Sequence, residues 1–167
     1  KPEKIKARAV PFENDDYRLV CNGKDVGGNL QTFDYSCGMI FSKKKYQYGY
    51  YEIRFRSQEG KGLWPAFWLY AGHENDEIDI FEINGSRNAD LHVDVHCKNG
   101  CKNYKTTLGL ARKNWGDYLK TSGNWQGGYN VISIEWQPDY IKWFLNGKAV
   151  AFWKGKFDYP MWLIADI

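Results

Sequence analysis

The sequence predicts an all-β protein: a two-sheet antiparallel β-sandwich, formed as one domain over residues 1–167. Aromatic residues and glycine are abundant, with 8 Trp, 12 Tyr, 9 Phe and 17 Gly, a composition that favours strands joined by turns. The apolar residues occur in short runs separated by turn signals, which is typical of a sandwich and not of alternating βα units. A chain of 167 residues is also long enough to bury one sizeable core.

The expected strands follow one another from Ser36 onward. The region before it is rich in turn-forming residues and contains one short strand-like segment, YRLVC (17–21). The later strands are, in order, GMIFS (38–42), YGYYEIRFRS (48–57), LWPAFWLY (63–70), DEIDIFEI (76–83), DLHVDVHC (90–97), YNVISIEW (129–136), YIKWFL (140–145), AVAFW (149–153) and MWLIADI (161–167). Turns at 137–139 and 146–147 join three of them into a meander, and no helix is predicted.

Side chains alternate between two faces along these strands, because successive residues of a strand point in opposite directions. One face is apolar and suits a core, as with Phe67 and Leu69. The other face carries acids, arginines and large aromatics, among them Glu52, Arg54, Trp64, Trp68 and Tyr70. Aromatic rings stack on sugar rings while charged groups bind hydroxyls, so this face indicates a carbohydrate cleft. An ordinary solvated sheet face would explain any one of these residues, but it explains the grouped aromatics less well.

The segment ENDEIDIFEING (74–85) places acids inside an otherwise apolar strand. Glu77 and Asp79 are two positions apart, so they share a face at a spacing of about 6.5–7 Å. Glu82 follows Glu77 at an odd offset and would face the core of a regular strand. Either Glu82 is buried and paired, or a β-bulge near residues 80–81 returns it to the acidic face. With the bulge, three carboxylates line one strand. Retaining glycosidases need two, and a third between them can hydrogen-bond the nucleophile and share a proton.

The sequence resembles glycoside hydrolase family 16 over roughly residues 36–167. EIDIFE matches the bulged E-x-D-x-x-E signature of the laminarinase- and agarase-like members, and YGYYEIRFR, GLWPAFWLY and YNVISIEWQPDYIKWFLNGK look like neighbouring strands of that family. The resemblance implies a jelly-roll sandwich with a concave substrate cleft. Family members normally continue beyond the position of MWLIADI, so we expect the domain's C-terminal strands to be missing from this chain.

The resemblance also implies roles for individual residues. Glu77 matches the nucleophile, Asp79 the assisting carboxylate and Glu82 the general acid/base. The substrate-binding residues that it implies are Trp64, Trp68, Tyr70, Glu52 and Arg54, together with His96, which is expected beside the acid/base residue. Asp166 occupies a position where several relatives have an asparagine near the substrate.

We therefore expect an endo-acting retaining hydrolase of a β-linked polysaccharide, with β-1,3- or β-1,3-1,4-glucan as the favoured substrate. One alternative is an endo-β-galactanase acting on agar, porphyran, carrageenan or mucin-type galactans, which Arg54, Arg56 and the lysines would suit. Another is a non-catalytic carbohydrate-binding module on the same fold. The loop AGHENDE (71–77) replaces the Trp-Pro run that is usual in laminarinase-type members, so the sugar itself is left open.

Composition limits the partners and the location. The net charge of +3 is spread along the chain, so no nucleic-acid partner is expected, and no apolar run is long enough for membrane insertion. We expect a monomer that is secreted, periplasmic or at the cell surface, because polysaccharides do not cross membranes. No cofactor and no active-site metal are expected, while a structural calcium is left open. Disulfide formation is also left open for the four cysteines, Cys21, Cys37, Cys97 and Cys101.

Overall fold

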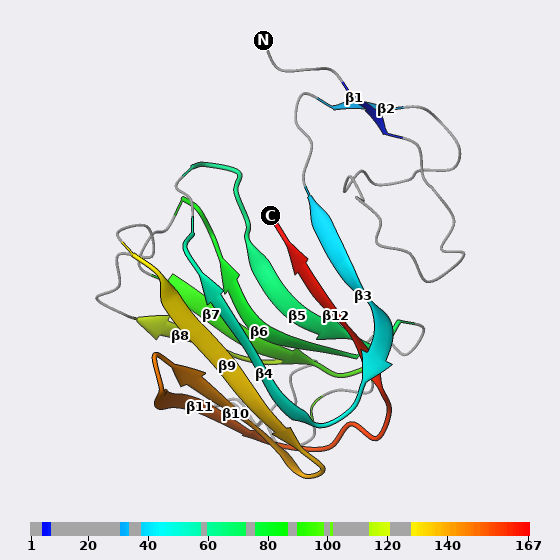
Figure 1. Ribbon diagram of the computed structural model, residues 1–167, viewed down its shortest axis with the longest axis vertical. Coiled ribbons are helices and arrows are strands. Elements are labelled where there is room, and N and C mark those ends of the chain that lie inside the picture. Colours follow the sequence, from blue (N-terminus) through cyan, green and yellow to red (C-terminus); the bar gives the residue numbers. More distant parts are fainter. Residues whose placement is uncertain are drawn as a thin grey trace, which may run out of the picture.

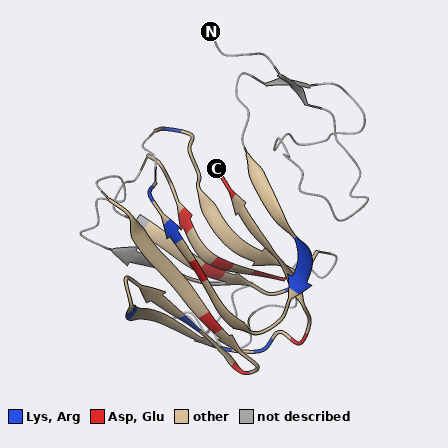
Figure 2. Cartoon of the chain, viewed as in Figure 1, with Lys and Arg blue, Asp and Glu red and all other residues tan. Residues whose placement is uncertain are grey.

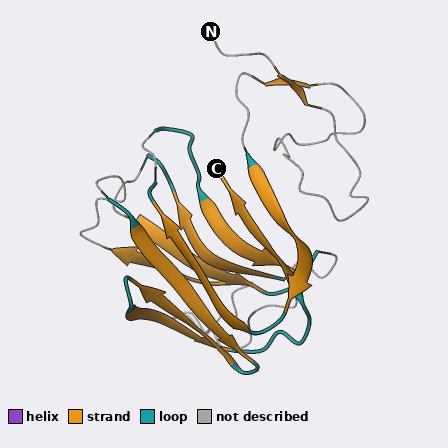
Figure 3. Ribbon diagram, in the orientation of Figure 1, coloured by secondary structure: helices purple, strands orange, loops and turns teal. Residues whose placement is uncertain are grey.

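The computed structural model describes residues 5–7, 31–33, 38–57, 60–72, 76–86, 90–98, 101, 114–120 and 128–167. Every regular element in these ranges is a strand (Figure 3). The strands form a two-stranded, a four-stranded and a six-stranded sheet, and the two larger sheets stack as a sandwich (Figure 1). Within these ranges, no helix has the length and hydropathy needed to cross a bilayer. The expected all-β sandwich is confirmed.

The six-stranded sheet has the strand order β3-β12-β5-β6-β7-β8, and all of its pairs are antiparallel. Its strands are β3 (Met39–Tyr46), β5 (Ala66–Tyr70), β6 (Glu77–Ile83), β7 (Asp90–His96), β8 (Asn114–Lys120) and β12 (Met161–Asp166). The acidic segment forms β6 near the middle of this sheet. Figure 2 shows acidic positions toward the middle of the sheet and a basic patch at one end of β3.

The four-stranded sheet has the order β11-β10-β9-β4. Its strands are β4 (Gly49–Phe55), β9 (Asn130–Gln137), β10 (Tyr140–Leu145) and β11 (Lys148–Lys154). Asn146 and Gly147 both have positive φ, 48° and 78°, as the tight turn between β10 and β11 requires. The predicted meander is confirmed. The remaining pair, β1 (Ile5–Ala7) and β2 (Gln31–Phe33), forms the two-stranded sheet.

The core lies between the two large sheets and is built mainly from aromatic and branched side chains. Trp136 and Trp143 of the four-stranded sheet are fully buried, and the rings of Phe55 and Phe81 stack across the interface at 4.2 Å. The Trp143 indole donates a hydrogen bond of 3.0 Å to the backbone carbonyl of Asp79. A buried indole N–H needs such a partner, so this bond fixes the backbone of β6 from inside the core.

Three differences separate the expected strands from the observed ones. The short strands β1 and β2 were not predicted, because they lie in the region that is rich in turn-forming residues. The strand β8 was not predicted, because its sequence NWGDYLK has too few apolar residues to stand out from a loop. The strand β4 belongs to the four-stranded sheet and pairs with β9, so it is not a neighbour of β5 or β6. The expected strand YRLVC (17–21) lies outside the described residues.

Candidate active site

A β-bulge in β6 brings the acidic residues onto one face. Phe67 of β5 pairs with Phe81, and the next residue, Trp68, pairs with Asp79, so Ile80 is the extra residue of the bulged strand. The pairing of β6 with β7 shifts at the same place, between Asp79 and Glu82. The predicted bulge is therefore confirmed, and the alternative in which Glu82 faces the core is wrong.

The strand register arranges the site in rows across the sheet. The first row joins Tyr70, Glu77 and His96, and the second joins Trp68, Asp79 and Asp94. The third row joins Asp166, Ala66, Glu82 and His92. Each row crosses β5, β6 and β7, so aromatic residues of β5 and polar residues of β7 flank the three acids. Ile78 and Ile80 point the opposite way and are fully buried in the core.

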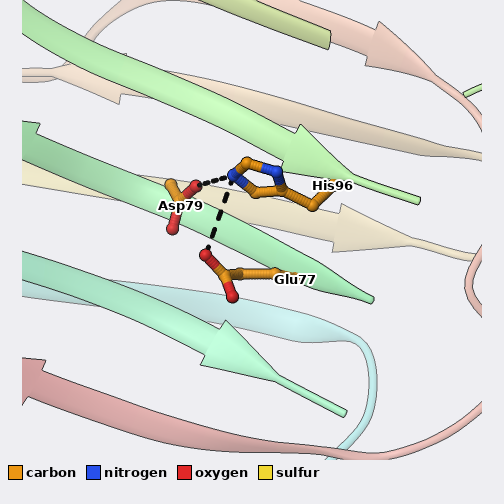
Figure 4. A group of neighbouring side chains, drawn as sticks. All are labelled: Glu77, Asp79 and His96. Atoms are coloured by element: carbon orange, nitrogen blue, oxygen red, sulfur yellow. Dashed lines mark ion pairs between the residues drawn. The ribbon is translucent and has the colours of Figure 1, made fainter. Parts of the chain in front are cut away.

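Glu77, Asp79 and His96 form one contact group (Figure 4). His96 Nε2 lies 3.1 Å from Asp79 Oδ2 and 3.7 Å from Glu77 Oε1. Asp79 is 2% exposed, whereas the side chains of Glu77 and His96 are partly open to solvent. An ionised carboxylate at such depth needs a close cation, and His96 supplies it.

Burial and mutual repulsion raise the pKa values of both acids in this group. Burial first, and the charge of Asp79 second, raise the pKa of Glu77 to about 8. Burial raises the pKa of Asp79 to about 6, although the hydrogen bond from His96 opposes the rise. The same hydrogen bond raises the pKa of His96 to about 9. The group therefore retains at least one shared proton at neutral pH.

The same three residues have the spacing of a metal site. One ligand atom from each of Glu77, Asp79 and His96 lies within 4.8 Å of the others, and no other such trio occurs in the described part of the chain. A protonated imidazole cannot bind a metal, and the pKa of His96 is raised to about 9, so a proton competes strongly with a metal there. The question of a structural calcium stays open, and the absence of an active-site metal stays a prediction.

Both carboxylate oxygens of Glu82 have nitrogen neighbours. Trp64 Nε1 donates to Oε1 at 2.8 Å, and His92 Nδ1 lies 3.0 Å from Oε2. Burial alone would raise the pKa of Glu82, but the hydrogen bonds from His92 and Trp64 outweigh it and lower the pKa. Trp64 reaches Glu82 from the loop before β5, where Ile83 N–H donates to Pro65 O and holds that loop against β6.

Aromatic residues and one further acid complete the face. The rings of Trp68 and Tyr70 lie 5.6 Å apart on β5, on the same face as the three acids. Trp68 Nε1 donates to Asp166 Oδ1 at 2.9 Å, and burial raises the pKa of Asp166. The negative charge of Glu82 also contributes to the raised pKa of Asp166. The expected positions of Trp64, Trp68 and Tyr70 beside the acids are confirmed, while their roles in substrate binding stay predictions.

The structure corrects the positions of three residues. Glu52 and Arg54 lie on the outward face of β4 in the four-stranded sheet, and Glu52 accepts a hydrogen bond from the Tyr50 hydroxyl there. Alternation assigned them to the polar face of their strand correctly, but it could not reveal that β4 belongs to the other sheet. His96 lies beside Glu77 and Asp79, and the histidine beside Glu82 is His92. The register of β7 determines which of these two histidines lies beside Glu82, and that register could not be predicted from the sequence.

Two residues of the site were missed, His92 and Asp94. They precede His96 at intervals of two on β7, so all three side chains share a face. The alternating pattern H-x-D-x-H is the signal that would have found them. Asp94 is buried, and its Oδ2 lies 3.8 Å from His92 Nε2 and 3.6 Å from His96 Nε2.

A disulfide closes the end of β7 next to His96. Cys97 and Cys101 are bonded, with their Cα atoms 5.2 Å apart. This settles one of the pairings that the sequence left open, whereas Cys21 and Cys37 lie outside the described residues.

Comparisons with known proteins agree with this geometry. The model of the family described as "Glycosyl hydrolases family 16" matches residues 9–164. A protein named beta-glucanase from Rhodothermus marinus is 29% identical over 188 residues, covering 98% of this chain and 56% of that protein. The endo-1,3-1,4-beta-glycanase EglC of Rhizobium meliloti is 28% identical over 153 residues, covering 87% of this chain and 30% of that protein. The chain thus spans less than two thirds of these curated relatives.

Solved structures show the same fold. LamAcat from Zobellia galactanivorans aligns with a TM-score of 0.67 at 26% identity, covering 81% of this chain and 59% of that chain. The beta-glucanase of Bacillus licheniformis aligns with a TM-score of 0.68 at 18% identity, covering 98% of this chain and 77% of that chain, and at this identity it supports the fold alone. Since the family match extends over most of the sequence and includes the bulged acidic strand, this chain belongs to glycosyl hydrolase family 16.

Proposed function

We propose that this domain is an endo-acting retaining hydrolase of β-1,3- or β-1,3-1,4-linked glucan. The observation that carries the proposal is the bulge in β6, which puts Glu77, Asp79 and Glu82 on one face between aromatic residues and histidines. A retaining mechanism needs two carboxyl groups on one face, one as nucleophile and one as general acid/base, and this strand supplies two such groups. The names of the relatives, beta-glucanase and endo-1,3-1,4-beta-glycanase, support the substrate class.

Each acid has one role in the proposed reaction. Glu77 attacks the anomeric carbon and forms a glycosyl ester, while Glu82 gives its proton to the leaving glycosidic oxygen. In the second step, Glu82 takes a proton from water, which attacks the anomeric carbon and releases Glu77. Asp79, held by His96 at 3.1 Å, hydrogen-bonds Glu77 and shares its proton.

The pKa values of the acids in the free site place a condition on this mechanism. The raised pKa of Glu77, about 8, favours its protonated form, which is no nucleophile. His96, whose pKa is raised to about 9, is a cation beside Glu77, and its charge lowers the pKa of Glu77 without cancelling the effects of burial and of Asp79. The proposed mechanism therefore requires Glu77 to lose its proton before it attacks the sugar. The pKa of Glu82 is lowered in the open site, and a sugar that excludes water from the cleft raises it toward the range of a general acid.

Two observations support a location outside the cytoplasm. Polymeric glucans do not cross membranes, and the disulfide between Cys97 and Cys101 persists in oxidising compartments. We assign the domain to a secreted, periplasmic or surface-attached protein on these grounds.

The test is product analysis on a panel of polysaccharides. Laminarin, mixed-linkage glucan, agarose, carrageenan and a mucin-type galactan are each incubated with the wild type, with Glu77→Gln and with wild type treated with a chelator. Early oligosaccharides from the two glucans are expected, with none from Glu77→Gln and no effect of the chelator. Products from a galactan would replace the substrate class, and loss of activity on chelation would show that a metal ion supports the activity. Binding without products would indicate a carbohydrate-binding module.

A further inference from the structure

Three polar side chains of β7 lie opposite the three acids of β6. His92, Asp94 and His96 alternate along β7, and the register sets them opposite Glu82, Asp79 and Glu77 in turn. His96 serves the pair Glu77 and Asp79, as described above. His92 is the separate histidine at the other end of the row, in contact with Glu82.

The two neighbours of the Glu82 carboxyl group are chemically different. The Trp64 indole N–H can only donate, so Oε1 always accepts its hydrogen bond of 2.8 Å. His92 Nδ1, at 3.0 Å from Oε2, donates only in the forms of the ring that carry a proton on Nδ1. The position of Oε2 and its proton affinity therefore depend on His92, while the contact from Trp64 stays constant.

The structure holds the His92 ring in place from behind. Its Nε2 lies 3.8 Å from Asp94 Oδ2, and each ring nitrogen thus faces a carboxylate oxygen. On β8, Gly116 pairs with Asp94, and a Cβ atom added at Gly116 would lie 2.9 Å from His92 Nε2 and 2.9 Å from Asp94 Cγ. Any larger residue at 116 would displace the ring, so the glycine leaves the space that the histidine occupies.

We propose that His92 is a positioning residue for Glu82: its Nδ1–H donates to Oε2, fixes the carboxyl group toward the cleft and sets the pH above which Glu82 loses its catalytic proton. The inference rests on the proposed role of Glu82 as the general acid/base. Other groups act on the same pair. Those that act on Glu82 or His92 from the same and neighbouring strands are Glu77 and Asp79 of β6, Asp94 and His96 of β7, and Asp166 of β12.

The first test measures Glu82 directly and needs no turnover. The side-chain carboxyl of Glu82 is titrated by ¹³C NMR in the wild type, in His92→Leu and in His92→Asn, with the signal assigned through Glu82→Gln. His92→Leu removes the donor, so the pKa of Glu82 is expected to rise by about one unit. Asn keeps an N–H near the place of Nδ1, so the pKa in His92→Asn is expected to stay near the wild-type value. His92→Ala serves as a second donor-free variant if the leucine variant fails to fold.

Two results would overturn the role of His92: an unchanged Glu82 pKa in a folded donor-free variant, or equal shifts in the donor-free and asparagine variants. The second test follows kcat/KM for glucan hydrolysis against pH. The alkaline limb is expected to move upward with His92→Leu by the same shift as the NMR pKa, and to stay in place with His92→Asn. A shift by NMR in a protein that cleaves no polysaccharide would overturn the proposed function while supporting the contact between His92 and Glu82.

Discussion

The outward faces of the two sheets use similar residues for different purposes. On the four-stranded sheet, Tyr50 and Phe152 are more than half exposed, and Lys142 lies over the ring of Phe144. The charges there stay in water. On the six-stranded sheet, Asp79 is 2% exposed and its neighbours have strongly shifted pKa values.

Residue types therefore do not distinguish the two faces, but burial and spacing do. A glutamate on an exposed strand pays no desolvation cost, so Glu52 needs no cation and can be replaced freely. Glu77 shares a partly buried face with two more acids and has a cation at 3.7 Å. The bulge is what concentrates these charges, because a regular strand would separate Glu82 from the other two.

The largest expected difference between the faces is in turnover. Glu77→Gln and Glu52→Gln are the same chemical change at the two faces. We expect Glu77→Gln to lower kcat for glucan hydrolysis by about 10³-fold or more, because an amide cannot serve as the nucleophile. Glu52→Gln is expected to retain activity within about twofold, since Glu52 is exposed on the other sheet and is given no part in the proposed reaction. Initial rates of reducing-sugar release measure both.

A large loss of activity in Glu52→Gln would contradict the distinction and return β4 to the substrate site. Circular dichroism of both variants serves as the folding control. Near-normal activity in Glu77→Gln would remove the proposed nucleophile.

Much of this site could be predicted from the sequence because strand alternation has a period of two. That period grouped Trp68 and Tyr70 with the acids. The odd offset of Glu82 left a buried glutamate or a bulge as alternatives, and the family resemblance favoured the bulge. The period was insufficient for Glu52 and Arg54, since alternation defines the faces of one strand but carries no information on which strands pair. The prediction that His96 lies beside Glu82 was wrong for a similar reason, because the register between β6 and β7 depends on the bulge and on packing.

The second comparison concerns two tyrosines. Tyr70 lies beside Trp68 on the same face as the three acids, whereas Tyr50 is 59% exposed on the other sheet, where its hydroxyl contacts Ser133 Oγ at 2.6 Å. Loss of one stacking ring costs about 1.4 kcal/mol, so Tyr70→Ala is expected to raise KM about tenfold. Tyr50→Ala should leave KM unchanged. Kinetics on mixed-linkage glucan test the pair, and equal effects in both variants would argue for a second sugar-binding face.

The smallest expected effect is on stability, and its dependence on pH separates the two faces without any substrate. The folded-state pKa of Glu77 is raised from 4.5 to about 8, so the folded protein binds a proton that the unfolded chain has already lost between these pH values. Stability therefore falls as pH rises through this window, and ionisation of Glu77 is unfavourable to the fold above it. Glu77→Gln removes this titration.

The melting temperature of Glu77→Gln should match the wild type near pH 4.5 and exceed it by about 2–4 °C at pH 8. Glu52→Gln should follow the wild-type curve throughout, because Glu52 lies on the exposed face of β4, outside the cluster of acids. Scanning calorimetry from pH 4.5 to 9 gives both curves, and a gain for Glu77→Gln that is constant with pH would assign the effect to packing instead of charge. A gain that grows with pH would mean that the close spacing of the acids, which the proposed reaction needs, also lowers the stability of the fold. The exposed face of β4 would show no such loss of stability.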